Sequence, residues 1–312
     1  MRQNTLTQTD IEQTQPSVAV IAAYNEDRFI GSVIHKTRQF VDQVVVVDDG
    51  STDQTAWIAE QAGAVVLRHE RNQGKAQALN TGLGHVRTLR SCAVVLLDGD
   101  GQHDPAAIPA LLAPIIDGAA DVVVGSRFLG VPSQIPRWRI FGQRVLTVAT
   151  NIASGTALSD SQSGFRALSP RAAKHLTFRP EGGFSIESEM QFLVNQHGLK
   201  VQEVPVVVTY QEPAKRNPVG HGMQVINGII ALVSQHRPLF FFGVPGMLTF
   251  IAGLIIGIIV VERYNTYMQL AVGYALISVL LCLIGIQTVF TGVILHTIRA
   301  FLTDHHAAQE PE

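Results

Sequence analysis

The sequence predicts an α/β catalytic domain with a mostly parallel sheet, followed by two transmembrane helices. Two observations predict this fold class. Over residues 17–210, short runs of β-branched and other apolar residues alternate with helix-like stretches, and the catalytic domain is predicted at 17–218. Charge is also unevenly distributed, because 42 of the 48 Lys, Arg, Asp and Glu residues lie in 1–237 and only 6 in 238–312. The carboxy-terminal quarter therefore has the composition of membrane spans, and the rest that of a water-soluble domain.

Apolar runs bounded by turns are typical of strands that are buried on both faces of a parallel sheet. The predicted strands are Val18–Ala23, Val44–Val47, Ala64–Leu67, Ala93–Leu97 and Val122–Val124. Stretches such as 30–40 and 55–62 lie between these strands and are predicted to be crossover helices. Strands that alternate with helices imply a doubly wound sheet.

Two uncharged segments are predicted to span a membrane, at residues 238–261 and 270–298. The first has 24 residues without a charge, and the second is apolar almost throughout. Roughly 20 apolar helical residues cross a bilayer core. A short polar turn is expected at Glu262–Tyr267. Gly253 and Gly257 have the spacing of a helix-packing motif, which we interpret as chance in a glycine-rich run. The alternative to two membrane spans is a helical hairpin buried in the core of a soluble domain.

The charges that flank these segments predict their orientation. Lys215, Arg216 and Arg237 precede the first span and Arg299 follows the second, so the positive-inside rule places the catalytic domain and both termini in the cytoplasm. Residues 1–16 are expected to form a flexible N-terminus without a signal-peptide core. Residues 219–237 are predicted as an amphipathic interfacial helix, with a helix packed on the soluble domain as the alternative. Residues 299–312 are expected to form a cytoplasmic tail.

Composition excludes several classes of protein. A formal net charge of -2 is not the basic footprint of a nucleic-acid binder. The only two cysteines, Cys92 and Cys282, argue against a structural disulfide and are too few for a cysteine zinc site. The segment Asn72–Ala76 holds a Gly-Lys pair without the other residues of a P-loop. The dinucleotide fingerprint and the esterase elbow are also missing from the sequence.

Acidic residues follow three of the predicted strands, at Asn25–Asp27, Asp48–Asp49 and Asp98–Asp100. The carboxyl ends of parallel strands meet at one edge of a sheet, where ligands bind. One such cluster is explained by helix capping. Three on one edge favour a divalent cation, Mg²⁺ or Mn²⁺, bound to a diphosphate.

These motifs, in their order, resemble those of the family 2 glycosyltransferases of the GT-A fold. The matching residues are Ala22–Glu26, Val47–Ser51, and Asp98-Gly-Asp100 with Gln102. Further motifs are similar to those of dolichyl- or polyprenyl-phosphate hexose synthases with a two-helix membrane hairpin, and these are Gly125–Arg127, Asp160–Arg166, Ile186–Glu189, Val204-Pro205 and Lys215–Pro218. The resemblance covers roughly residues 17–237.

The resemblance implies roles for individual residues. The nucleotide sugar would be bound by Ala22, Tyr24, Glu26, Val47, Asp49, Asp98, Gly99, Arg127 and Lys215. The metal would be bound by Asp98, Asp100 and Gln102, and the acceptor phosphate by Arg127 and Arg139. The implied catalytic residues are Asp100, Arg127, Asp160 and Lys215.

The sequence departs from the family in two places. Ala22 stands where the family usually has proline, and Thr209 stands where dolichyl-phosphate mannose synthases often have arginine. Either Arg216 replaces that arginine or the phosphate clamp differs. Residues 134–138 spell the QxxRW of processive polysaccharide synthases, but they precede the Asp160 motif instead of following it, so we interpret them as coincidence.

The implied reaction is inverting transfer of a hexose from GDP-mannose or UDP-glucose to dolichyl or polyprenyl phosphate at the cytoplasmic membrane face. A lipid phosphate is already ionised, so it needs no dedicated base, whereas a sugar hydroxyl does. Arg and Lys would bring the two anions together. The alternatives are a membrane glycosyltransferase that acts on a hydroxyl in polysaccharide or glycolipid synthesis, and an inactive transport or scaffold subunit. The expected partners are the nucleotide sugar, the lipid phosphate and membrane lipid, without nucleic acid; homo-oligomerisation stays open.

Overall fold

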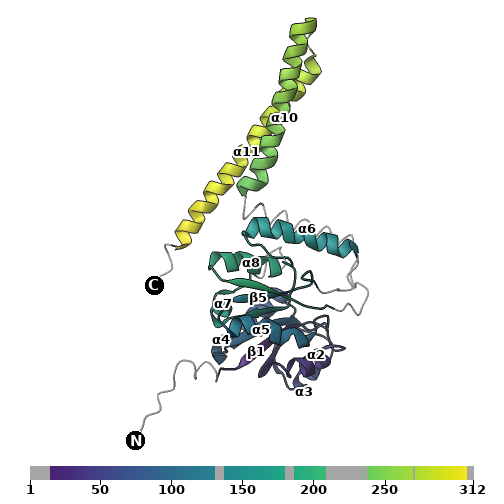
Figure 1. Cartoon of the computed structure of the whole chain (residues 1–312), viewed down its shortest axis with the longest axis vertical. Helices are drawn as coiled ribbons and strands as arrows, with labels where there is room; N and C mark the ends of the chain where they lie inside the picture. Colours follow the sequence, from purple (N-terminus) through teal and green to yellow (C-terminus); the bar gives the residue numbers. More distant parts are fainter. Residues whose placement is uncertain are drawn as a thin grey trace. The chain divides into compact units, whose positions relative to one another are not determined.

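The computed structural model describes residues 15–130, 137–179, 186–208, 234, 238–269 and 271–307, and within these only the backbone at 137–139, 141 and 299–307. The chain divides into two compact units, residues 1–229 and 230–312. Figure 1 shows the mixed α/β elements of the first unit and the helices of the second. The interfacial helix predicted at 219–237 falls almost entirely outside the described residues.

The described part of the first unit contains a seven-stranded sheet in the order β3-β2-β1-β4-β6-β5-β7. β1 is parallel to β2 and β4, β2 to β3, and β5 to β7, while β6 is antiparallel to both of its neighbours. The fold class is therefore confirmed, and the five predicted strands are present. The bounds are β1 Ser17–Ala23, β2 Gln43–Asp48, β3 Val65–Arg68, β4 Ala93–Asp98, β5 Val122–Ser126, β6 Arg166–Leu168 and β7 Val201–Pro205.

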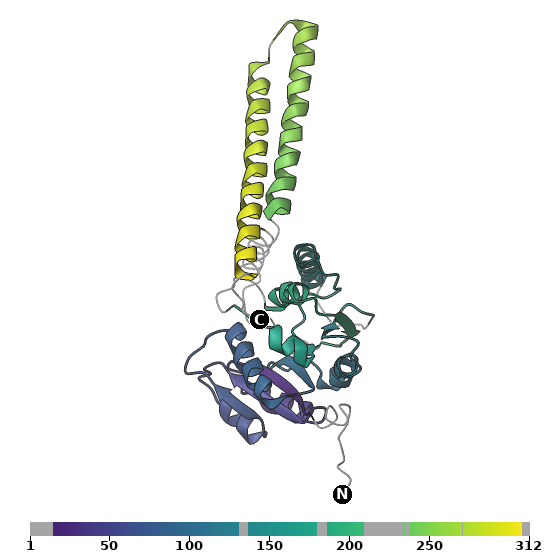
Figure 2. The same cartoon turned by 90° about the vertical axis from the view of Figure 1, so that its left-hand side faces the viewer.

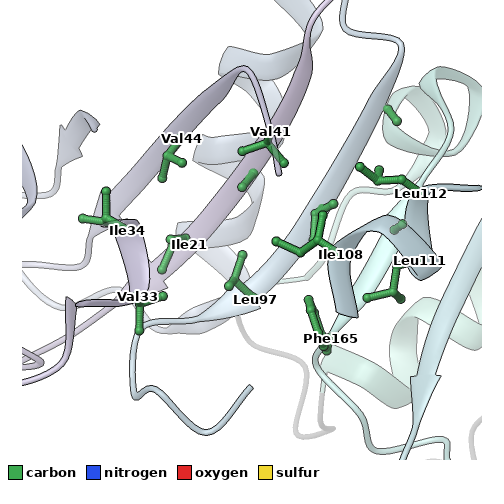
Figure 3. Packing of buried hydrophobic residues seen from close by; sticks show 14 of the residues in the cluster. Ile21, Val33, Ile34, Val41, Val44, Leu97, Ile108, Leu111, Leu112 and Phe165 are labelled. Carbon is green, nitrogen blue, oxygen red and sulfur yellow. The ribbon is translucent and has the colours of Figure 1, made fainter. Parts of the chain in front are cut away.

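Helices cover both faces of this sheet, as continuous apolar strands require. Alternate residues of β1 pack on opposite faces: Ile21 belongs to the core shared with α2, α3 and α5, shown in Figure 3, and Val20 to the core shared with α4, α7 and α8. The helices are α2 Ile30–Thr37, α3 Thr55–Gln61, α4 Lys75–Leu89, α5 Ile108–Ile116 after the 3₁₀ turn Pro105–Ala107, α6 Arg137–Ser154, α7 Pro170–His175 and α8 Ile186–Gln196.

The second unit is a pair of helices that lie side by side, α10 (Pro238–Tyr267) and α11 (Val272–Ala307), as Figure 2 shows. Both are long and apolar enough to cross a membrane, with mean hydropathies of 2.5 for α10 and 2.3 for Val272–Ile298. The polar turn expected at 262–267 is wrong, because α10 continues through it. The polar residues 262–267 were expected to form a turn, but they are exposed and can stay helical because water solvates their side chains.

Glycines set the distance between these two helices. A Cβ at Gly253 would lie 2.8 Å from the backbone nitrogen of Cys282, and one at Gly285 would lie 2.6 Å from that of Phe250. The hydroxyl of Ser278 also donates to the carbonyl of Gly253 at 2.8 Å. Small residues allow this close approach in apolar helix pairs. The interpretation of Gly253 and Gly257 as a chance spacing is therefore wrong, since a Cβ at Gly257 would also meet Ser278, at 2.8 Å.

Candidate active site

The carboxyl ends of β1, β2 and β4 lie at one edge of the sheet, because these strands are parallel neighbours. Hydrogen bonds join the loops that follow β1 and β2. Ser51 Oγ accepts from the backbone N–H of Asn25 at 2.9 Å, and Thr55 Oγ1 accepts from that of Glu26 at 2.8 Å. In return, Asn25 Oδ1 accepts from the backbone N–H of Thr52 at 2.9 Å. The first two sequence motifs thus form one frame beside the sheet.

Asp49 anchors a third loop to this frame. Its carboxylate accepts hydrogen bonds from the backbone N–H groups of Gln73 at 2.9 Å and Gly74 at 2.8 Å, and His69 Nδ1 lies 2.7 Å away. These contacts fix the loop that leads into α4. Asp49 is 4% exposed, so its observed role is to position this loop, and its predicted contact with the nucleoside stays a prediction.

The other residues predicted to bind the nucleoside differ in accessibility. Tyr24 is 45% exposed at the edge, and Ala22 and Glu26 are partly exposed. Val47 has no exposed surface and packs in the core under α4. The observed role of Val47 is in the core of the sheet, and its predicted contact with the nucleoside stays a prediction.

A half-buried lysine neutralises part of the acidic cluster at the end of β4. The ammonium of Lys75, at the start of α4, lies 2.7 Å from Asp98 Oδ1 and 2.9 Å from Glu187 Oε1 on α8. The sequence motifs pointed to Asp98 but gave no role to Lys75 or Glu187. The Gly74-Lys75 pair was the only sequence signal for this lysine. It was compared only with a P-loop, which it does not match, so no role was assigned to Lys75.

These charges determine the pKa values of the cluster. Burial opposes ionisation of Asp98, but the Lys75 ammonium and His103 outweigh it and hold the pKa of Asp98 well below its usual range. Burial would lower the pKa of Lys75, yet Asp98 and Glu187 raise it above its usual value. Burial and the neighbouring Asp98 charge raise the pKa of Asp100. The Lys75 ammonium thus neutralises the charge of Asp98, whereas burial and the Asp98 charge disfavour the ionised form of Asp100.

The arrangement of Asp98 and Asp100 fits a divalent cation that is bound together with a diphosphate. Among the described residues, no three His, Cys, Asp or Glu side chains converge on a point that would hold a metal alone. Mg²⁺ typically takes one or two carboxylates and completes its shell with phosphate oxygens and water. Burial and the Asp98 charge raise the pKa of Asp100, and a cation bound beside it would favour its ionised form. Gln102 lies in the same loop, where its backbone N–H donates to Asp100 Oδ1 at 3.0 Å.

Two glycines allow close approach of chain segments in this region. A Cβ at Gly99 would lie 3.2 Å from the Ala23 side chain, so glycine lets the loop after β4 lie against β1. A Cβ at Gly164 would lie 3.0 Å from Asp98 Oδ2 and 3.2 Å from Lys75 Nζ. Gly164 therefore brings the segment between α6 and β6 directly against the acidic cluster.

That segment contains Asp160, which forms a buried bidentate pair with Arg127. The guanidinium Nε and Nη2 donate to Asp160 Oδ2 at 2.6 Å and Oδ1 at 2.7 Å, and the backbone N–H of Arg127 donates to Oδ2 at 3.1 Å. Asp160 is fully buried and Arg127 is 9% exposed. The sequence singled out both residues as catalytic, and the structure brings them together. Their contact with substrate stays a prediction.

Two further residues, to which the sequence gave no role, fix the conformation of this segment. Glu203 on β7 accepts from the backbone N–H groups of Ser159 at 2.8 Å and Asp160 at 3.1 Å. Arg166 is 1% exposed and donates to the carbonyl oxygens of Ser163 and Ser161, both at 2.8 Å. Burial lowers the pKa of Arg166 to about 10, although nearby carboxylates oppose this shift. The Asp160–Arg166 motif is thus in large part a structural loop wrapped around a buried guanidinium.

Two predicted phosphate-binding side chains lie outside the described residues. Lys215 is outside the described ranges, as are Thr209 and Arg216. Arg139 lies in the first turns of α6, where only the backbone is described. Their roles stay predictions.

The sheet and the acidic edge define a glycosyltransferase of the GT-A fold, and the comparisons with known proteins give its family. Residues 18–177 match the model of Glycosyl transferase family 2, so the chain belongs to this family, as the sequence motifs predicted. A solved structure with the same fold is glucosyl-3-phosphoglycerate synthase from Mycobacterium tuberculosis in complex with Mg²⁺ and uridine diphosphate. It is 25% identical, with a TM-score of 0.57, over 76% of this chain and 85% of that chain.

Two curated relatives extend the comparison. The UDP-N-acetylglucosamine–dolichyl-phosphate N-acetylglucosaminyltransferase of Methanococcus voltae is 30% identical over 214 residues, which are 62% of this chain and 85% of the relative. Glycosyltransferase AglJ of Haloferax volcanii is 29% identical over 288 residues, 90% of this chain and 93% of the relative. The second match therefore includes much of the helical pair as well as the catalytic unit.

Proposed function

We propose that this glycosyltransferase transfers a hexose from a nucleotide sugar to a polyprenyl phosphate, with inversion at the anomeric carbon. The product would be a membrane-bound lipid-phosphate sugar that serves as a donor for later transfers. The relative named for transfer to dolichyl phosphate supports this acceptor. The two membrane-length helices support an acceptor that stays in the bilayer.

The observation that carries the proposal is the engagement of the carboxylates around the site other than Asp100, which is proposed to hold the cation. Asp160 is buried against Arg127, Asp98 and Glu187 share Lys75, and Glu203 accepts backbone N–H groups. A carboxylate committed in this way is poorly placed to take a proton from an attacking hydroxyl. An ionised lipid phosphate needs no such base. Its difficulty is repulsion from the donor diphosphate, which positive groups relieve.

On the donor side, Asp98, Asp100 and Gln102 would hold Mg²⁺ or Mn²⁺ with the diphosphate. When bound, this cation supplies positive charge against the negative charge that develops on the leaving diphosphate. The complex of the M. tuberculosis neighbour with Mg²⁺ and uridine diphosphate supports a divalent cation. Lys75 keeps Asp98 ionised and oriented, and Arg127, Arg139 and Lys215 are proposed to contact donor or acceptor phosphate.

The catalytic unit is proposed to face the cytoplasm, because the basic residues that flank the helical pair outnumber those in its connection. Activated nucleotide sugars are soluble anions, so the transfer takes place on the side of the membrane where they are made. Protease access to the catalytic unit in sealed inside-out and right-side-out vesicles tests this orientation.

The test of the function is transfer of labelled sugar into organic-extractable lipid, with GDP-mannose, UDP-glucose and UDP-N-acetylglucosamine as donors and dolichyl or undecaprenyl phosphate as acceptors. A lipid-phosphate sugar is released by mild acid, whereas an ordinary glycoside resists it. Asp100→Asn should abolish transfer. Asp104→Asn is the matched control, because Asp104 lies in the same loop and caps a 3₁₀ turn, a role that asparagine fulfils equally well. An acid-resistant product would instead support the hydroxyl-directed alternative.

A further inference from the structure

Lys75 lies against the carboxylate of Asp98, which is expected to hold the divalent cation. Its ammonium is 2.7 Å from Asp98 Oδ1. The other oxygen, Oδ2, lies 3.8 Å from His103 Nε2, and a Cβ at Gly164 would lie 3.0 Å from it. The side chain of Asp98 is 29% exposed, so a divalent cation can approach it, but the cation then meets the positive charge of Lys75.

A second carboxylate holds the ammonium of Lys75 in place. Glu187 Oε1, on α8, lies 2.9 Å from Nζ, and hydrogen bonds between charged groups at this length are strong. Burial favours the neutral form of Lys75, but the two carboxylates raise its pKa above the usual value, so the side chain stays charged at neutral pH. Another cation can therefore replace it at Asp98 only when the ammonium moves away, and Glu187 is the partner that it keeps.

We propose that Lys75 competes with the divalent cation for Asp98, so that the site takes up the cation together with the donor diphosphate and not before it. The proposal rests on the proposed function, because it takes Asp98 and Asp100 as ligands of the cation. Lys75 is a positioning residue in this role, since it acts on the cation through Asp98. Beyond keeping Asp98 ionised, it makes cation binding depend on the donor.

The charges around Asp98 explain why the diphosphate matters. A cation that binds without it must separate Lys75 from Asp98, and the ammonium then keeps Glu187 alone. A donor diphosphate adds negative charge that attracts the cation and the ammonium together, and its oxygens complete the coordination shell of the cation. Binding of the cation and binding of the donor are then coupled, and each raises the affinity for the other by the same factor.

The experiment measures Mn²⁺ binding to the full-length protein in detergent without nucleotide, by the loss of the electron paramagnetic resonance signal of free Mn²⁺. Lys75→Met should bind Mn²⁺ at least about tenfold more tightly than the natural protein, because a neighbouring positive charge is gone. Glu187→Gln should weaken binding, because the ammonium then has only Asp98 of its two carboxylates. Lys200→Met is the matched control and should leave the affinity unchanged. This exposed lysine loses the same charge but precedes β7, at the strand ends opposite to Asp98.

Addition of uridine or guanosine diphosphate should narrow the difference between Lys75→Met and the natural protein, because the diphosphate supplies the negative charge that the ammonium loses at Asp98. An Mn²⁺ affinity that is unchanged or weaker in Lys75→Met would overturn the proposal, since removal of a lysine that only holds Asp98 in place would not strengthen binding. Equal tightening in Lys200→Met would also overturn it, because net charge alone would then explain the effect.

Glu187→Gln keeps the ammonium and decides the question if Lys75→Met does not fold. Weaker Mn²⁺ binding in Glu187→Gln supports the proposal, and unchanged or tighter binding overturns it. Failure of the proposed function has a different signature. If the natural protein binds no Mn²⁺ with either diphosphate, the metal site of the proposed function is overturned and this inference with it, whereas the other contrary outcomes overturn the inference alone.

Discussion

Replacing Lys75 by methionine should destabilise the catalytic unit and make its stability depend on divalent cations. The ammonium lies within 3 Å of both Asp98 and Glu187, so the variant removes the cation that these two carboxylates share. Removal of one partner from a buried ion pair costs about 3–5 kcal/mol. Because the Lys75 side chain is 32% exposed, we expect the lower end of this range, about 3 kcal/mol. For a domain of about 200 residues this lowers the Tm by roughly 6–12 °C.

The assay is thermal unfolding of the full-length protein in detergent, with EDTA or with Mn²⁺. Lys75→Met should be the less stable protein in EDTA and should recover more on addition of Mn²⁺ than the natural protein does. Adding Glu187→Gln to Lys75→Met removes one of the two uncompensated charges and should restore part of the loss. The reasoning is refuted if Lys75→Met costs less than about 1 kcal/mol and Glu187→Gln brings no recovery.

Asp100→Asn should raise the Tm by a few degrees at neutral pH while weakening Mn²⁺ binding, measured by calorimetry with the nucleoside diphosphate. Since the folded-state pKa of Asp100 is raised, its ionised form opposes folding, and the advantage of the variant should vanish as the pH falls to about 4. Gly164→Ala should reduce sugar transfer, because its Cβ would press on Asp98 and Lys75. Gly84→Ala is the control on an open helix surface, and it should stabilise the protein by up to about 1 kcal/mol. Equal losses of activity in the two variants would contradict a specific effect at Gly164. Asp160→Asn should cost about 3 kcal/mol in urea unfolding, and an unchanged midpoint would exclude a stabilising pair with Arg127.

The sequence predicted the central strands well because they are continuous apolar runs with an unambiguous period. It missed β6 and β7 for a physical reason. β6 has three residues and contains Arg166, a buried charge that satisfies itself with carbonyl oxygens, so neither its length nor its polarity is typical of a central strand. β7 carries Glu203, whose carboxylate is used to hold a loop.

Single motifs located the acidic edge, but long-range partners determine what each residue does. Asp98 follows directly from its position after β4, whereas Glu187 lies 112 residues beyond Lys75 and is joined to it only by the fold. Arg127 was expected to bind phosphate and to act in catalysis, and Asp160 was expected to act in catalysis. Their mutual pairing across 33 residues depends on the loop geometry that Glu203 fixes, which no local pattern contains.

The glycine contacts between α10 and α11 bear on the fate of the product. Where Gly253 meets Cys282 and Gly285 meets Phe250, the two main chains touch, and a hexose with its shell of water has no passage between them. The single pair of helices α10 and α11 thus anchors the protein and does not form a channel for the sugar. The lipid-phosphate sugar that we propose as the product would need a separate translocation step to carry its polar head to the other leaflet.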